Sequence, residues 1–151
     1  MRAVLQRVSG ARVEIEGEPG RGIGQGFVVL LGIETGDSAE DIGWLVRKLV
    51  RLRLFDGDEG EMSRSILDCG GDVLLISQFT LLGTTKKGTR PSYNRAAAPF
   101  EAVPLYEAFI RELEAALGKP VATGTFGAEM RVALTNDGPV TLILDSKRRD
   151  F

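Results

Sequence analysis

The chain has 151 residues, a formal net charge of −2 and no histidine. Its 43% hydrophobic and 26% charged residues are typical of a soluble globular protein, and its length predicts one domain over residues 1–151. The missing histidine excludes His-dependent catalytic triads and His-rich zinc sites, and the single Cys69 excludes an internal disulfide and a thiolate metal site.

Apolar patterns predict three strands in the first part of the chain. Residues 2–8 and 12–16 are two candidates, and the second alternates apolar and charged side chains, so that one face is wet. Residues 17–26 form a glycine-rich connection that lacks a phosphate-loop pattern. Residues 27–33, "FVVLLGI", are continuously apolar and predict a buried strand.

A helix is predicted next, beginning after Ser38. Ser38 is a good N-cap, and Asp41 completes a capping-box pattern before apolar residues at helical spacing. In residues 51–55 leucine then alternates with arginine, which favours a strand. Residues 56–62, "DGDEGEM", predict a turn.

The second half of the chain begins with a buried strand at residue 72, which becomes polar towards residue 83. Residues 84–104 form an irregular loop of a length typical of functional segments. Pro104 suits the first turn of a second helix, which Gly118 would end. Three further strands are predicted: 121–125, 130–135 and 140–145.

Together these elements predict an α/β fold with about eight strands and two helices. We expect a mixed, partly antiparallel sheet or barrel-like core with the helices packed on it. Residues 147–151, "KRRDF", are expected to be a solvated tail. The N-terminal residues lack the apolar core of a signal peptide, and the apolar run 27–33 is too short to span a bilayer, so we expect a cytoplasmic protein with no membrane association.

Polar residues follow the predicted strand that begins at residue 72. Ser77, Gln78 and Thr80 in "SQFTL" are uncharged donors and acceptors at a strand end, where they suit a polar ligand or an oxyanion. Strand-end capping is the alternative explanation. Phe126 and Met130 lie beside glycines and predict either a pocket wall or ordinary core.

Cations gather in "KKGTRP". Lys86, Lys87 and Arg90 are the best local candidates for phosphate contacts, and Tyr93 follows them. A solvated loop is the alternative.

The stretch "TNDGPVTLILDS" places Gly138 and Pro139 in front of a predicted strand. Because proline cannot donate to a sheet ladder, this dipeptide indicates either a turn or backbone that a ligand contacts.

Two motifs now carry a resemblance. "SQFTL" at 77–81 and "TNDGPVT" at 135–141 resemble the signature motifs of the D-aminoacyl-tRNA deacylase family. Asn136, Gly138, Pro139 and Thr141 match the second motif. "MRAVLQRVS", "KKGTRPSY" and "FGAEM" also resemble that family, so that the similarity extends over essentially the whole chain.

The resemblance implies an editing hydrolase that cleaves the ester between a D-amino acid, or glycine, and the terminal adenosine of a tRNA. It implies a homodimer with the fold of that family and with no metal or cofactor. It further implies that the Gly138–Pro139 bond is cis and reaches into the partner's pocket, where its backbone rejects L-amino acids.

Roles of individual residues follow from the same resemblance. The catalytic pocket wall would comprise Ser77, Gln78, Phe79 and Thr80. Substrate binding would involve Gly138, Pro139, Asn136, Phe126, Met130 and Arg7, with Arg7 holding the Gly-Pro segment. The tRNA itself would contact Lys86, Lys87 and Arg90.

Two mechanisms are compatible with the motifs. Thr80 acts as nucleophile in one, and in the other the substrate's ribose 2′-hydroxyl assists hydrolysis. We favour the second, because the sequence shows no base partner for Thr80. Three other functions stay open: a related tRNA deacylase with a trans Gly-Pro bond and a different substrate, a non-catalytic RNA-binding module, and a small-molecule hydrolase.

Overall fold

The first strand pairs with three other strands of the sheet. In the computed structural model, which describes residues 1–150, β1 spans Arg2–Ile15 and pairs with β8 (Met130–Asp145) along nearly its whole length. On its other side, β1 pairs first with β3 (Gly26–Gly32) and then with β2 (Arg21–Ile23). All three pairings are antiparallel, so β1 is the central member of the antiparallel part of the sheet.

Two predictions of paired short strands are wrong, because each pair is one long strand. The predicted strands 2–8 and 12–16 are the two halves of β1, and 130–135 and 140–145 are the two halves of β8. The ladder between β1 and β8 shifts register between Gln6 and Gly10. A bulge interrupts the apolar alternation in the same way as a turn does, and this accounts for the error.

The remaining strands extend the sheet in parallel. β6 (Asp72–Ser77) lies parallel to β3, and β7 (Ala122–Thr123) lies parallel to β6 and is shorter than predicted. The strand order is β2-β1-β3-β6-β7, with β8 on β1. β3 and the apolar stretch of β6 are buried on both faces, as their continuous apolar sequences predict.

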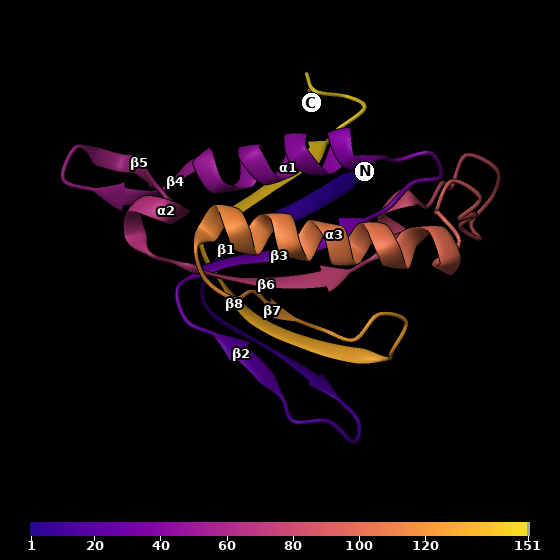
Figure 1. The fold of residues 1–151 in the computed structure, drawn as a ribbon, viewed down its shortest axis with the longest axis horizontal. Helices are drawn as coiled ribbons and strands as arrows, with labels where there is room; N and C mark the ends of the chain where they lie inside the picture. The colour runs from indigo at the N-terminus through magenta and orange to yellow at the C-terminus, as the bar shows by residue number, and fades with distance from the viewer. Residues whose placement is uncertain (151) are drawn as a thin grey trace.

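Two long helices cover the same face of the sheet (Figure 1). α1 (Ala39–Arg51) begins after Ser38 as predicted, and the Ser38 N–H donates to Asp41 Oδ2 at 2.8 Å. α3 (Pro99–Leu117) begins earlier than predicted, because Pro99 and not Pro104 occupies its first turn. Within residues 1–150, no helix is long and apolar enough to cross a membrane.

Smaller elements lie at the two ends of the helical layer. β4 (Arg53–Gly57) and β5 (Gly60–Ser65) form a hairpin, followed by α2 (Ile66–Cys69). A 3₁₀ helix, η1 (Phe79–Leu82), follows β6. The strand predicted at 51–55 corresponds to β4, which begins two residues later than predicted. β5 and α2 were not predicted. The sequence of β5 is largely polar and has no apolar alternation that would indicate a strand.

The core occupies both sides of β3 and β6. Phe27, Val29 and Leu75 pack with the apolar faces of α1 and α3 in one cluster. Val28 and Leu74 point to the opposite side, where the second half of β1 covers them with Val8, Ala11 and Val13. The sheet therefore curls over itself, and the predicted mixed α/β fold with a barrel-like core is confirmed.

A buried carboxylate ties the C-terminal segment to α1. Asp41 is 3% exposed; the Ser146 hydroxyl donates to it at 2.6 Å and the Lys147 ammonium at 2.9 Å. Burial alone raises the pKa of Asp41, but these hydrogen bonds outweigh it and hold the pKa well below its ordinary value. Residues 147–150 are exposed, as expected of a solvated tail, but Lys147 and also Arg149, which pairs with Glu40, attach this segment to α1; Phe151 lies outside the described residues.

We predict that Asp41→Asn lowers the free energy of unfolding by about 3 kcal/mol at pH 7, because Lys147 and Ser146 lose a buried anionic acceptor. Since the pKa of Asp41 is lowered by folding, its contribution is present above the ordinary carboxyl value of 3.8 and is lost as the pH falls below it. Denaturant titrations of both proteins between pH 7 and pH 3 measure this difference.

Glu40→Gln is the matched control. Glu40 is the adjacent residue and pairs with Arg149 at the surface, so its loss changes stability by less than about 1 kcal/mol. Equal effects of the two substitutions would contradict the role given to Asp41.

Candidate functional site

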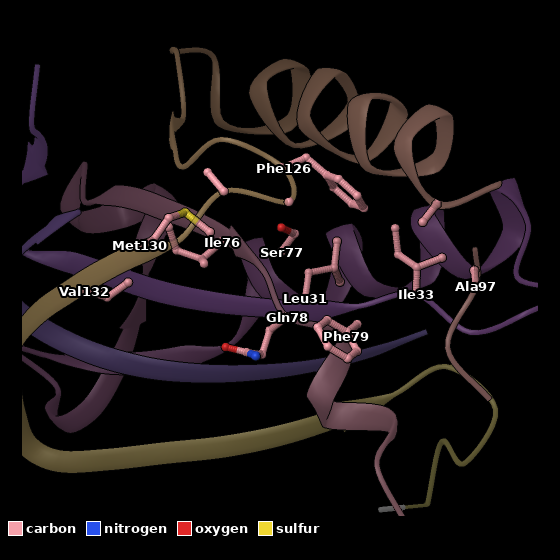
Figure 2. A pocket seen from close by; sticks show the side chains of 13 residues that line it. Leu31, Ile33, Ile76, Ser77, Gln78, Phe79, Ala97, Phe126, Met130 and Val132 are labelled. Carbon is pink, nitrogen blue, oxygen red and sulfur yellow. The ribbon is translucent and has the colours of Figure 1, made fainter. Parts of the chain in front are cut away.

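A cavity with a volume of about 310 Å³ opens at the C-terminal end of β6. Ser77, Gln78 and Phe79 form one wall, and Phe126 and Met130 lie across from them (Figure 2). The remaining lining residues are small or aliphatic: Leu31, Ile33, Ile76, Ala97, Ala102, Gly127, Ala128 and Val132. The cavity is thus a mainly apolar pocket with a polar edge.

The pocket brings together five residues that the sequence placed in a site, from two segments far apart in the chain. Thr80 is adjacent but does not line the pocket. Its side chain is at the exposed start of η1, where the Gln78 amide donates to Thr80 Oγ1. Within residues 1–150, no carboxylate or amine is hydrogen-bonded to Thr80, so the structure supplies no base for this hydroxyl.

The pocket contains no titratable side chain among the described residues. Two tyrosines lie behind aromatic residues of the pocket wall: the ring of Tyr93 lies 5.0 Å from that of Phe79 and the ring of Tyr106 lies 5.8 Å from that of Phe126. The Tyr106 hydroxyl donates to the Leu75 carbonyl at 3.1 Å. Burial raises the pKa of Tyr106 to about 12, so it stays neutral. Among the described residues, the lining of this pocket therefore offers only neutral donors and acceptors.

The backbone supplies two such donors. In η1 the first N–H to donate to a carbonyl of the same turn is that of Leu81, which bonds to Gln78 at 3.3 Å. The N–H groups of Phe79 and Thr80 precede it and have no acceptor within the helix. Phe79 lines the pocket and Thr80 directly follows it, and N–H groups without an acceptor suit a developing negative charge.

The second motif forms a bulge in β8. Val8 pairs with Asn136 and Gln6 pairs with Thr141, so residues 137–140 oppose Arg7 alone. The Asn136 side chain spans this bulge, since its Oδ1 accepts from the Val140 N–H at 3.1 Å and its Nδ2 donates to Thr141 Oγ1 at 3.0 Å. Asn136 and Thr141 therefore close the base of the segment that contains Gly138 and Pro139.

Arg7 fills the gap that the bulge leaves. Its Nε donates to the Asp137 carbonyl at 3.0 Å, and its Nη1 donates to the Leu54 carbonyl in β4. Gly138 has a φ of +124°, and a Cβ there would lie 2.9 Å from Arg7 Nη2. Arg7 thus lies against the Gly-Pro segment, which it was expected to hold. The Gly138–Pro139 peptide bond is cis.

The predicted site residues fall in three places: the pocket, the bulge in β8 and the loop that follows η1. Gly138 and Pro139 are exposed and do not line the pocket of their own chain. Lys86, Lys87 and Arg90 are exposed on the loop that follows η1, at the end of the molecule away from the β4–β5 hairpin (Figure 1). The structure therefore joins Ser77, Gln78 and Phe79 of the first motif with Phe126 and Met130, and neither the Gly-Pro segment nor the three cations line that pocket.

Several residues that line the pocket were not predicted from the sequence. Leu31 and Ile33 belong to an apolar strand and could not be distinguished from core, and Ala97 and Ala102 carry no chemical signal. Within residues 1–150, no group of His, Cys, Asp and Glu side chains is arranged to hold a metal ion.

Comparison with known proteins places this geometry in context. Residues 4–145 match the family described as D-Tyr-tRNA(Tyr) deacylase. A D-aminoacyl-tRNA deacylase of Bacteroides thetaiotaomicron is 56% identical over 99% of this chain and 100% of its own. Another, of Chromobacterium violaceum, is 55% identical over 97% of this chain and 98% of its own.

Two solved structures are similar over nearly the whole chain. The c-Myc DNA unwinding element binding protein has a TM-score of 0.88 and 38% identity, over 96% of this chain and 98% of that one. A probable eukaryotic D-amino acid tRNA deacylase has a TM-score of 0.81 at 20% identity, over 95% and 97%, which shows the shared fold.

We predict that Arg7→Lys destabilises the bulge. A lysine has no fork of donors that reaches both carbonyls, so one of them is left without its partner, at a cost of about 1–3 kcal/mol in unfolding free energy. Hydrogen exchange at residues 137–141 is expected to accelerate. Arg12→Lys, on the same strand but exposed and paired with Glu14, is the control and changes neither quantity. Unchanged exchange in Arg7→Lys would argue against its role in holding the bulge.

Proposed function

The chain belongs to the D-Tyr-tRNA(Tyr) deacylase family and is a D-aminoacyl-tRNA deacylase, and we propose how its two separate structural features divide the work of this hydrolase. The pocket at the end of β6 holds the aminoacylated end of the tRNA. The bulge at Gly138–Pro139 selects the configuration of the amino acid. We expect the enzyme to act in the cytoplasm, where tRNAs are charged.

The composition of the pocket supports its role in substrate binding. Its apolar wall suits the side chain of a D-amino acid and the terminal adenosine, and Ser77 and Gln78 offer hydrogen bonds that orient the ester. Phe79 is 56% exposed and lies 5.0 Å, between ring centroids, from Tyr93, so an aromatic edge borders the pocket beside the loop with Lys86, Lys87 and Arg90. That loop would neutralise phosphates near the 3′ end.

The exposed bulge supports a homodimer in which each subunit completes the pocket of the other. Gly138 and Pro139 are presented rigidly by Arg7 and Asn136, yet they make no contact with the pocket of their own chain. In the proposed dimer this backbone forms the wall that an L side chain would meet. Exclusion of that side chain gives the selectivity, and glycine passes because it has none, which extends the substrates to glycyl-tRNA(Ala).

Within residues 1–150, no titratable side chain lines the pocket, and this observation is the main support for the proposed mechanism. Water attacks the ester carbonyl, the bond to the ribose 3′-oxygen breaks, and the neighbouring 2′-hydroxyl of the substrate assists the transfer of the proton. The N–H groups of Phe79 and Thr80 stabilise the oxyanion. Thr80 takes part through its backbone, because its hydroxyl has no base to activate it.

We predict that Thr80→Ala retains deacylation of D-tyrosyl-tRNA within about tenfold, because only the side chain is removed and the backbone N–H remains. A D-tyrosyl-tRNA whose terminal adenosine lacks the 2′-hydroxyl loses the assisting group, and single-turnover rates should fall by about 10² to 10⁴. Complete loss of activity in Thr80→Ala with tRNA binding intact, or full activity on the 2′-deoxy substrate, would refute this mechanism.

We predict that Gly138→Ala weakens the discrimination between D- and L-tyrosyl-tRNA. A methyl group at this φ and 2.9 Å from Arg7 displaces the bulge, with a strain of about 1–3 kcal/mol, and a full loss of that energy from the discrimination would change the ratio of the two rates by about 5- to 150-fold. Gly17→Ala is the matched control, because Gly17 has a φ of +78° but no neighbouring atom within 4 Å of an added Cβ. An unchanged ratio in a folded Gly138→Ala protein would exclude the bulge as the selective element.

A further inference from the structure

A group of cations on α1 and the start of β4 lies outside every residue assigned above. Residues 42–55 contain four cations and no carboxylate: Arg47, Lys48, Arg51 and Arg53. We call these four residues the α1 cation cluster. They stand in a chain whose formal net charge is −2, so the local charge is opposite to that of the whole.

The cluster borders an open groove. Together with Trp44 and Leu52 it lines a volume of about 450 Å³, with the Lys48 ammonium 5.8 Å from the centroid of the Trp44 ring. All four cationic residues are exposed. Within residues 1–150, none of the four forms an ion pair with a carboxylate.

Stabilisation of the helix explains only part of this arrangement. Lys48 and Arg51 lie in the last turn of α1, where cations interact favourably with the helix dipole. Arg47 is further from the terminus, and Arg53 lies beyond the helix. Like charges at this spacing repel one another, so the complete cluster is better explained by an anionic partner.

We propose that the α1 cation cluster binds the phosphate backbone of the tRNA substrate. Regularly spaced phosphates are the anions that a row of unpaired, exposed cations neutralises, with release of counterions. The position of the cluster fits this partner. Arg53 directly precedes Leu54, whose carbonyl accepts from Arg7, and Arg7 also binds the carbonyl of Asp137, next to Gly138. One side chain thus connects the cluster to the Gly-Pro bulge.

This inference rests on the proposed function, because only in the proposed dimer does the link between the α1 cation cluster and the Gly-Pro bulge bring the cluster close to a bound tRNA. The bulge of one subunit enters the pocket of the other, so the cluster accompanies it to the side of the tRNA bound there. The RNA then passes between the loop with Lys86, Lys87 and Arg90 on the subunit that holds its end, and the α1 cation cluster of the partner subunit.

The test uses two double variants with equal changes of charge. Arg51→Glu with Arg53→Glu reverses part of the cluster, and Arg111→Glu with Arg131→Glu reverses two exposed cations elsewhere. For the cluster variant, KM for D-tyrosyl-tRNA should rise about tenfold with kcat unchanged, and the slope of log(kcat/KM) against log[salt] should become smaller by about 2. The control variant should change neither.

A short substrate separates this effect from damage to the pocket. The D-tyrosyl ester of adenosine has no RNA body, so the cluster variant should hydrolyse it as fast as the unmodified protein does. Arg51→Gln with Arg53→Gln provides a milder variant if charge reversal impairs folding, which circular dichroism detects. Equal KM values and salt slopes for cluster and control variants would overturn the proposal.

Direct binding distinguishes failure of this inference from failure of the proposed function. Trp44 is the only tryptophan in the chain and lines the groove, so its fluorescence should change when uncharged tRNA binds. The change should disappear in the cluster variant and persist in the control. Because this titration needs no hydrolysis, tRNA binding at the groove stays measurable even if the selectivity for D-amino acids were disproved. A fluorescence response that is equal in both variants counts against the cluster.

Discussion

The arrangement of the site depends on one guanidinium group. Arg7 lies opposite residues 137–140, where β8 leaves the ladder, and it donates to carbonyls of Asp137 and Leu54. A buried cation in this position substitutes for the strand hydrogen bonds that the bulge removes. It also joins three segments that are distant in sequence: the middle of β1, the start of β4 and the Gly-Pro segment. Without it, the protruding backbone would lose its connection to β1 and β4 and keep only the support that Asn136 gives within β8.

The titratable groups with shifted pKa values lie outside the pocket, which agrees with a mechanism that uses no side-chain base. Three carboxylates have lowered pKa values: Asp41 and Asp145 serve the packing of the C-terminal segment and β1, and Asp68 accepts hydrogen bonds from Ser65 at the start of α2. Tyr106 is a neutral support for Phe126. None of these groups lines the pocket. In the proposed mechanism the protein therefore contributes position and fixed dipoles, which suit an ester that is already reactive.

The sequence predicted the elements whose residues carry a local signal. Continuous apolar runs identified β3 and β6, and Ser38 with Asp41 located the start of α1. The bulges in β1 and β8 were mistaken for turns, because apolar periodicity does not distinguish a strand that continues out of register from one that ends. Pro104 misled in a similar way, since a proline within the second turn of a helix resembles one at its first position.

For the site as well, the sequence predicts some features and only the structure reveals others. Two motifs predict roles for Ser77 to Thr80 and for Asn136 to Pro139. The fold shows that the two motifs lie apart within one chain and that Arg7 connects the second of them to β4. The sequence alone does not indicate the α1 cation cluster, because cations on a helix usually form a solvated face. What revealed it was the groove and the absence of carboxylate partners within the described residues.

The neutral pocket has a thermodynamic consequence. A ligand that enters it changes the ionisation of no lining side chain, so binding exchanges no proton between those residues and the solvent. The protonation of the substrate's own amino group is then the ionisation that such a pocket senses. A fall in cellular pH would protonate this amino group and leave the charge of the pocket lining unchanged.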